Sequence, residues 1–163
     1  AHFGMAVGVA GIAVVANYQT ERDVRMDVNS YAELAGYTFT FRGTTEHDGP
    51  NYRAARGTLE VSRNGKLVAT LHPEKRIYNA GGMAMTEADI HPNIYRDIYV
   101  AMGEQLDDRG AWAVRLFYKP FINWLWFGAV FMVVGGFLAA SDKRYRIALR
   151  HSEVPKKLAA QGA

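Results

Sequence analysis

Residues 58–71 read TLEVSRNGKLVATL and carry the clearest fold signal in the sequence. Two alternating runs flank the dipeptide Asn64-Gly65. Asn-Gly suits the two-residue turn of a β-hairpin, because both positions of a type I′ turn need a positive φ angle. Alternation of apolar and polar residues is the period of a strand with one buried face. The stretch therefore predicts an antiparallel hairpin.

The same two-residue period recurs on both sides of this hairpin. It is clear in YTFTFR at 37–42 and in WAVRLFY at 112–118. Further strands are expected over 75–78 and 94–102, whereas TEAD at 86–89 resembles a single helical turn. About six strands with many turns and few helices favour a small antiparallel β barrel or sandwich, with an OB-like barrel as one form.

Residues 121–140 read FINWLWFGAVFMVVGGFLAA and contain no charged side chain. A helix of this length spans roughly 30 Å, the thickness of the hydrocarbon core of a bilayer. Trp124 and Trp126 near its start and Tyr145 beyond its end are aromatics that favour the headgroup regions. A buried core helix is the alternative, but protein cores seldom contain so long an uncharged run. The segment therefore predicts a transmembrane helix.

Residues 1–16 read AHFGMAVGVAGIAVVA, which is uncharged but short for a complete span. The segment lacks the basic start and cleavage site of a signal peptide. We interpret it as the C-terminal half of a transmembrane helix whose first turns lie outside the chain. The predicted organisation is therefore a transmembrane helix (C-terminal part) at 1–17, a periplasmic β domain at 18–119, a transmembrane helix at 120–141 and a basic cytoplasmic tail at 142–163. A charged connector at 18–29 is expected to open the β domain.

The charges of the chain are distributed unevenly. Its net charge is +3, and residues 142–163 hold six basic against two acidic side chains. Residues 17–119 hold thirteen basic and fourteen acidic ones. Basic residues collect on the cytoplasmic side of membrane helices, which places the tail in the cytoplasm and the β domain outside the inner membrane. Membrane lipid is therefore an expected partner and nucleic acid is not, because the basic stretch is short and adjoins a membrane span.

Few residues suggest catalysis. The absence of cysteine excludes a disulfide framework, a thiol nucleophile and an iron–sulfur cluster. No nucleophile elbow, phosphate loop or HExxH motif occurs in the sequence. The neighbouring carboxylates Asp107 and Asp108 are best explained as loop residues. Four histidines are expected at the surface: His47, His72, His91 and His151.

His2 differs from the other histidines, because it lies in an apolar, glycine-rich helix at membrane depth. An ionisable group there is costly and usually faces the interior of a helix bundle. A neutral imidazole is a good axial ligand for haem iron. A hydrogen bond to another helix, or a place near the headgroups, is the alternative. Gly4, Gly8 and Gly11 leave room for a large planar ligand or for a closely packed helix.

Several strings, in their order and spacing, resemble the C-terminal end of the CcmF family, the haem lyase of bacterial system I cytochrome c maturation. They are NYQTERDVRM at 17–26, YTFTFR at 37–42, GPN at 49–51, EKR at 74–76 with YN at 78–79, MTEA at 85–88, RDIY at 96–99 and WAVRLFYKPF at 112–121, followed by Trp124, Trp126, Gly128, Gly135 and Gly136. The resemblance covers nearly the whole chain. The related haem lyase for nitrite-reductase assembly is similar in this region.

The resemblance implies a multi-pass protein of the bacterial inner membrane. Such a protein takes haem from a periplasmic haem chaperone and helps to attach it to apocytochrome c, together with other maturation proteins. It also holds a structural b-type haem between membrane helices, and His2 matches the position of one axial ligand of the haem iron. The resemblance places no catalytic residue in this chain, which is expected to act only as part of a haem lyase complex.

For the β domain the resemblance implies position rather than chemistry. Residues 74–76 (Glu-Lys-Arg) are expected to be solvated strand residues, although they also suit haem propionates or a partner protein. Met83 and Met85 are expected to pack rather than to bind iron. The alternative function is a non-catalytic docking domain for the haem chaperone or for the partners that deliver apocytochrome.

Overall fold

The structure, a computed structural model, describes residues 2–141, so the predicted basic tail at 142–163 lies outside the described residues. The chain forms two compact units, and the smaller one contains the helical residues up to Ile12 and from Trp124 onward. The larger unit is Ala13–Asn123. In chain order the elements are α1 (His2–Tyr18), β1 (Thr20–Met26), β2 (Tyr31–Leu34), β3 (Tyr37–Asp48), β4 (Tyr52–Arg63), β5 (Lys66–Leu71), β6 (Glu74–Tyr78), β7 (Ala84–Glu87), β8 (Asp89–His91), β9 (Arg96–Gln105), β10 (Trp112–Pro120) and α2 (Ile122–Ser141).

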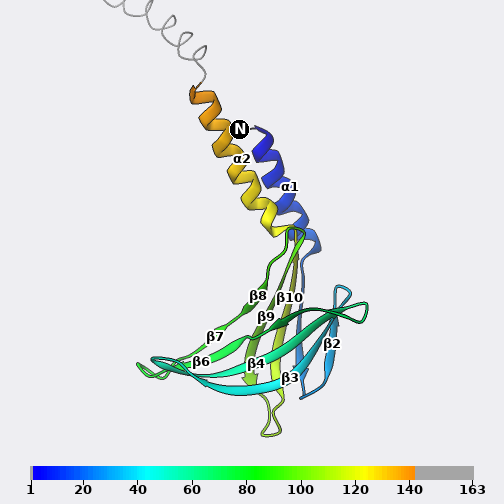
Figure 1. Cartoon of the computed structure of the whole chain (residues 1–163), viewed down its shortest axis with the longest axis vertical. Coiled ribbons are helices and arrows are strands. Elements are labelled where there is room, and N and C mark those ends of the chain that lie inside the picture. Colours follow the sequence, from blue (N-terminus) through cyan, green and yellow to red (C-terminus); the bar gives the residue numbers. More distant parts are fainter. Residues whose placement is uncertain (1, 142–163) are drawn as a thin grey trace, which may run out of the picture. The chain divides into compact units, whose positions relative to one another are not determined.

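The strands of the larger unit form two antiparallel sheets (Figure 1). One sheet has the order β1-β10-β9-β8. The other has the order β2-β3-β4-β6-β7, and β5 also pairs with β4. Of the two predicted alternatives, barrel and sandwich, the domain is therefore a sandwich, and the prediction of a small antiparallel β domain is confirmed.

The hairpin predicted at residues 58–71 is present. β4 and β5 pair antiparallel, with Arg63 opposite Lys66. The two turn residues Asn64 and Gly65 have φ angles of 51° and 74°, as a type I′ turn requires.

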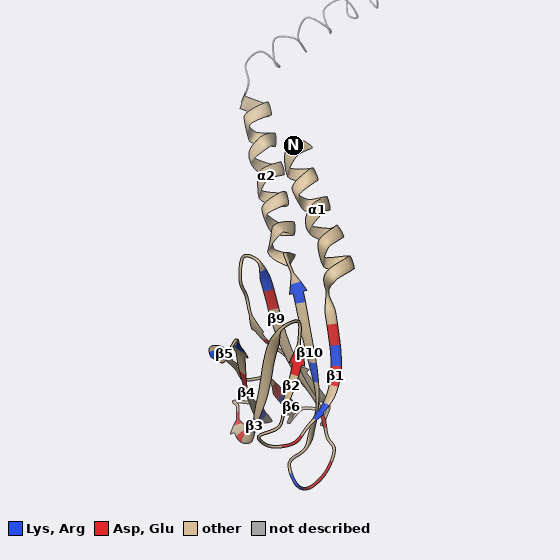
Figure 2. Ribbon diagram, turned by 90° about the vertical axis from the view of Figure 1, so that its right-hand side faces the viewer, with Lys and Arg blue, Asp and Glu red and all other residues tan. Residues whose placement is uncertain are grey.

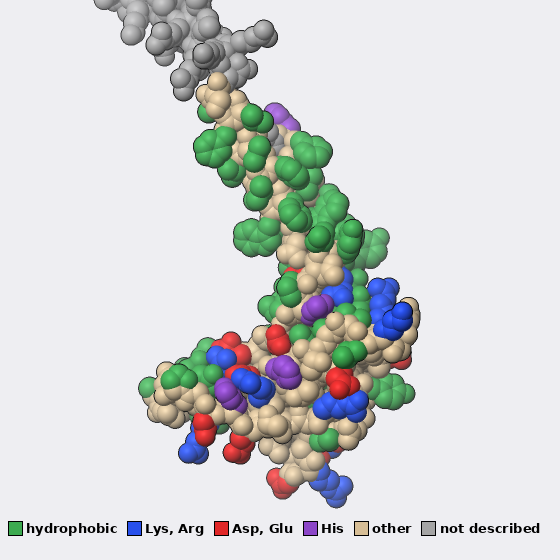
Figure 3. Space-filling view, viewed as in Figure 1, with side chains coloured by type: hydrophobic (Ala, Val, Ile, Leu, Met, Phe, Trp, Pro, Cys, Tyr) green, Lys and Arg blue, Asp and Glu red, His purple; other side chains and the backbone are tan. Residues whose placement is uncertain are grey.

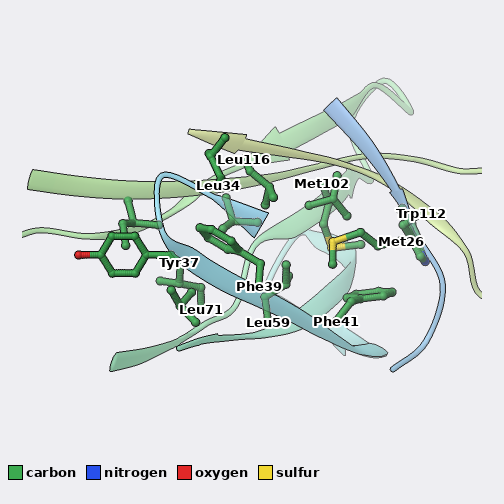
Figure 4. Packing of buried hydrophobic residues seen from close by; sticks show 14 residues of the cluster. Met26, Leu34, Tyr37, Phe39, Phe41, Leu59, Leu71, Met102, Trp112 and Leu116 are labelled. Carbon is green, nitrogen blue, oxygen red and sulfur yellow. The ribbon is translucent and has the colours of Figure 1, made fainter. Parts of the chain in front are cut away.

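The two sheets enclose one hydrophobic core (Figure 4). Phe39 and Phe41 of β3 and Leu59 of β4 enter it from one sheet, and Met102 and Leu116 enter it from the other. All five side chains are almost completely buried. Burial of a side chain of this size stabilises a fold by about 1.5–3 kcal/mol, so this cluster is the main source of stability of the sandwich.

The prediction of about six strands was too low, because the described residues contain ten. The expected connector at 18–29 is mostly strand β1, which pairs with β10 from Thr20↔Tyr118 to Met26↔Trp112. β1 is an edge strand that buries only Met26 fully. Its charged outer face therefore conceals the strand period in the sequence.

The expected helical turn at Thr86 was also wrong. Residues Ala84–Glu87 form strand β7, in which Thr86 lies opposite Lys75 of β6. The Thr86 hydroxyl donates to the backbone oxygen of Met102 at 3.0 Å rather than capping a helix. Pairing with β6 supplies the backbone hydrogen bonds that one isolated helical turn could not.

The two helices carry no Lys, Arg, Asp or Glu (Figure 2). Hydrophobic side chains cover their visible face (Figure 3). α2 is long and apolar enough to cross a membrane, judged by length and composition, and α1 is a shorter apolar helix.

Candidate functional site

α1 packs against α2 through glycines. A Cβ atom added at Gly4 would lie 2.5 Å from the backbone nitrogen of Met132. A Cβ atom added at Gly128 would lie 2.6 Å from the backbone nitrogen of Gly8 and 2.8 Å from the oxygen of Gly4. The backbones touch directly, which is the close approach that small residues allow between membrane helices.

This packing decides between the two uses predicted for the glycines of α1. Gly4, Gly8 and Gly11 face a neighbouring helix rather than a planar ligand, and an added Cβ at Gly11 would lie 3.2 Å from the nitrogen of Leu125. Beside the glycines, the rings of Phe3 and Phe131 meet edge to face with centroids 5.7 Å apart.

His2 lies on the opposite side of α1 from this contact. At 100° per residue, its side chain is about 160° around the helix from Gly4. His2 and Ala6, one turn further along, are both exposed. An exposed imidazole next to a small residue fits the coordination of the iron of a large planar macrocycle. Among residues 2–141, no group of three or more His, Cys, Asp or Glu side chains could hold a metal ion.

In the β domain, Glu74 is the centre of a buried ion-pair network. Its side chain is 6% exposed and accepts hydrogen bonds from Arg56 Nε at 2.6 Å and Arg76 Nε at 2.7 Å. Arg76 also lies 3.6 Å from Glu87 and stacks on the ring of Tyr52, 4.5 Å from its centroid. Glu74 and Arg76 therefore neutralise each other within the protein.

These contacts change the interpretation of residues 74–76. Glu74 is buried rather than solvated, and Arg76 is already engaged by carboxylates. Lys75 points to the other face of the sheet and donates to Thr86 Oγ1 at 3.1 Å. Met83 and Met85 do not pack as expected, because both are largely exposed.

Sequence reasoning missed an aromatic cluster on this part of the sheet. Tyr52 and Tyr78 are opposite each other on β4 and β6, with ring centroids 5.5 Å apart. His47 of β3 lies 6.5 Å from Tyr52, also measured between ring centroids. Tyr52 and Ala54 on either side of Arg53 are the signal that could have extended β4 to this cluster, but the alternation stops at Ala55.

Glu74 gives the domain a predictable response to acid. Burial alone would raise the pKa of Glu74, but the hydrogen bonds from Arg76 and Arg56 outweigh it and hold this pKa below its ordinary 4.5. A lowered native pKa contributes stability above the unfolded pKa, and that stability is lost as the pH falls through the native pKa.

We therefore expect Glu74→Gln to destabilise the domain by about 2 kcal/mol at neutral pH, because two charge-assisted hydrogen bonds are weakened. The difference from wild type should shrink as the pH is lowered below 4.5 toward the native pKa. The measurement is the thermal midpoint from the fluorescence of the buried Trp112. A difference in thermal midpoint that stays constant with pH would show that Glu74 is not the group responsible. Asp23 and Asp107 also have lowered pKa values, but they are present in both proteins and cancel in the comparison.

The remaining candidates behave as surface or loop residues. His72 is exposed, and His47 and His91 are half-buried at the domain surface. Asp107 accepts hydrogen bonds from the backbone nitrogens of Arg109 and Ala111 and pairs with Arg25, so it closes the loop between β9 and β10. His151 lies outside the described residues.

The fold and the helix pair define a class of protein: a β-sandwich inserted in sequence between two apolar helices. The family described as CcmF C-terminal beta-sandwich matches residues 17–120. The chain belongs to the CcmF family.

Relatives of known name agree with this assignment. The chain is 50% identical to the cytochrome c-type biogenesis protein CcmF of Pseudomonas aeruginosa over 92% of its own length and 23% of that protein. It is also 50% identical to CcmF of Escherichia coli, over 90% of this chain and 22% of that protein. A solved structure of the cytochrome c heme lyase CcmF has a TM-score of 0.67 at 22% identity, covers 82% of this chain and 22% of that one, and bears on the fold alone. The chain thus spans about a quarter of the length of these relatives.

Proposed function

We propose that this chain is the C-terminal part of a cytochrome c haem lyase that helps to ligate haem to apocytochrome c in the periplasm. In this proposal His2 of α1 is one axial ligand of a structural b-type haem. The chain provides no catalytic residue of its own and works within the lyase complex.

The observation that carries the haem proposal is the position of His2. α1 uses its glycine face to bind α2, so the face with His2 and Ala6 stays available for a ligand. His2 is exposed although it belongs to an apolar helix, and an imidazole at membrane depth needs a polar partner or a metal. The names of the relatives, which include cytochrome c-type biogenesis and heme lyase, support the same ligand.

Each part of the chain has a role in this proposal. A bound haem would supply the iron centre. The imidazole of His2 would bind the iron through a ring nitrogen. Gly4, Gly8 and Gly128 would fix the distance between α1 and α2. The apolar side chains of α1 beside His2 would help to exclude water from the ligand.

The proposed placement is the bacterial inner membrane, with residues 1–17 and 120–141 as transmembrane helices. The β domain at 18–119 is then periplasmic, where the haem chaperone and apocytochrome c are the proposed partners. The tail at 142–163 is then cytoplasmic, as its basic residues favour.

We expect His2→Ala in the full-length protein to abolish the b-type haem absorption and the assembly of cytochrome c. Removal of an axial ligand leaves the iron without its protein bond on that side, and added imidazole should restore part of the absorption. His72→Ala, which removes an exposed histidine of the β domain, is the control and should leave the spectrum unchanged. Normal haem content in the His2→Ala protein would disprove the ligand role.

The second candidate function is a non-catalytic docking domain for the haem chaperone or the partners that deliver apocytochrome. The observation in its favour is the exposure of Met83 (71%) and Ile77 (52%) beside the Tyr52–Tyr78 cluster. A photo-crosslinker at Met83 should capture such a partner, and the same crosslinker at Lys66 is the control. The related lyase for nitrite-reductase assembly is the other alternative. The chain is less similar to the cytochrome c-type biogenesis protein NrfE of Haemophilus influenzae (33% identical over 88% of this chain and 22% of that protein) than to the CcmF relatives.

A further inference from the structure

Both connections to the helices leave the β domain at one end, here called the tethered end. α1 ends at Tyr18 and β1 begins at Thr20, while β10 ends at Pro120 and α2 begins at Ile122. Thr20 lies opposite Tyr118 in the sheet, and Arg96 of β9 lies opposite Pro120. Only one residue separates β10 from α2, so Pro120 lies within a few ångströms of the first residue of α2 along the chain.

The tethered end contains two arginines on one tyrosine. The guanidinium carbon of Arg96 lies 4.9 Å from the ring centroid of Tyr37, and that of Arg63 lies 5.0 Å from the same centroid. Arg96 Nε donates to the Tyr37 hydroxyl at 2.8 Å and Arg63 Nη1 donates to it at 3.2 Å. Two like charges are thus held around one tyrosine ring.

These charges have no counter-ion within residues 2–141. Neither Arg63 nor Arg96 forms an ion pair with a described carboxylate. Arg96 is only 8% exposed, and its Nη1 has no hydrogen-bond acceptor among the described residues. Lys66, opposite Arg63 across the hairpin, and Lys119, next to Pro120, also lack an ion pair in this part of the chain. Buried charges are usually paired in proteins, so two unpaired arginines side by side give this end a concentrated positive charge.

Exposed apolar side chains adjoin the cations. In the loop before β9, Ile94 is 57% and Tyr95 63% exposed. The loop is held in place, because the Asn93 backbone nitrogen donates to Asp97 Oδ1 at 3.0 Å and the Phe121 nitrogen donates to the Tyr95 oxygen at 2.9 Å. Basic and aromatic side chains next to exposed aliphatic ones are typical of surfaces that enter the membrane interface.

We propose that the tethered end binds the phosphate of an anionic phospholipid, with the exposed Arg63 as its ligand, the buried Arg96 as a second positive charge behind it and the 92–95 loop against the acyl-chain boundary. A guanidinium group donates two parallel hydrogen bonds to phosphate oxygens, which Arg63 is exposed enough to do. A lipid is favoured over a soluble anion because one residue joins this end to α2. The inference rests on the proposed membrane placement of α2 and not on the haem ligand.

The test uses the purified, delipidated full-length protein in detergent. Short-chain phosphatidylglycerol, phosphatidylcholine and inorganic phosphate are added separately, and binding is measured by native mass spectrometry and by the thermal midpoint. Arg63→Gln is the main variant, because Arg63 is exposed and its loss should not unfold the domain. Arg109→Gln, in the loop between β9 and β10 at the opposite end, is the matched control for charge.

We expect phosphatidylglycerol to bind and stabilise the wild type and the Arg109→Gln protein, and Arg63→Gln to weaken that binding about fivefold. The proposal would be overturned by any of three results. Phosphatidylcholine could stabilise the protein equally, inorganic phosphate could stabilise it equally, or Arg63→Gln could leave the binding of phosphatidylglycerol unchanged. The His2→Ala protein should keep its preference for phosphatidylglycerol, so a failure of the haem proposal would leave this result intact. Recovery of the protein in the membrane fraction checks the placement of α2 independently.

Discussion

Gly128→Leu is expected to separate α1 from α2. Any Cβ at this position lies within 2.6–2.8 Å of the backbone of Gly8 and Gly4, and backbone atoms cannot move aside as a flexible side chain can. Overpacking costs about 1–3 kcal/mol in a core with some freedom, so a clash with backbone should exceed the upper end of that range. The helices would lose the contact that orients them.

The cysteine-free sequence makes this separation measurable. Cysteines placed at Phe3 and Phe131, whose rings meet at 5.7 Å between centroids, should be joined by a short thiol crosslinker in the membrane. Gly128→Leu should abolish this crosslink. Gly136→Leu is the matched control on the same helix, because an added Cβ there meets nothing within 4 Å. Retained crosslinking in the Gly128→Leu protein would refute the packing of the two helices.

Phe41→Ala should destabilise the β-sandwich by about 3–5 kcal/mol. Phe41 has 0% exposure and fills the space between the sheets, so its removal leaves a cavity lined by rigid strands. The unfolding midpoint, followed through Trp112, should fall strongly, and for many small domains a loss of this size removes most of the stability. Tyr31→Ala on β2, where the side chain is exposed, is the control and should change stability by less than about 0.5 kcal/mol. Equal effects of the two substitutions would show that Phe41 does not belong to the core.

The central strands could be predicted from the sequence because each has one fully buried face. In β3, Phe39 and Phe41 alternate with polar residues. Asn64-Gly65 marks the turn between β4 and β5. The edge strands could not be predicted so well. In β1 the charged side chains hide the alternation of a strand. The short strand β7 has only four residues, and its conformation depends on pairing with β6, which leaves no period in the local sequence.

The candidate site shows the same limit. His2 stands out in the sequence because imidazole is costly in an apolar helix. Only the structure shows that α2 packs on the glycine face and leaves His2 exposed on the opposite face. The burial of Glu74 depends on Arg56, which lies on a neighbouring strand 18 positions earlier in the chain. The Arg63–Tyr37–Arg96 group joins residues from three strands, β3, β4 and β9, and Arg96 is 59 positions from Tyr37. Such contacts arise from topology and leave no spacing that a sequence motif could capture.

The pairing of β1 with β10 has a consequence for the order of assembly. α1 and α2 are far apart in the chain, and their direct association would have to close a loop of about a hundred residues. Formation of the sheet brings Thr20 opposite Tyr118, and so brings the end of α1 and the start of α2 to neighbouring positions. The folded sandwich then raises the effective concentration of each helix near the other. The β domain therefore keeps the adjoining ends of the two helices close together. Slow folding of the sandwich would delay formation of the contact between Gly8 and Gly128.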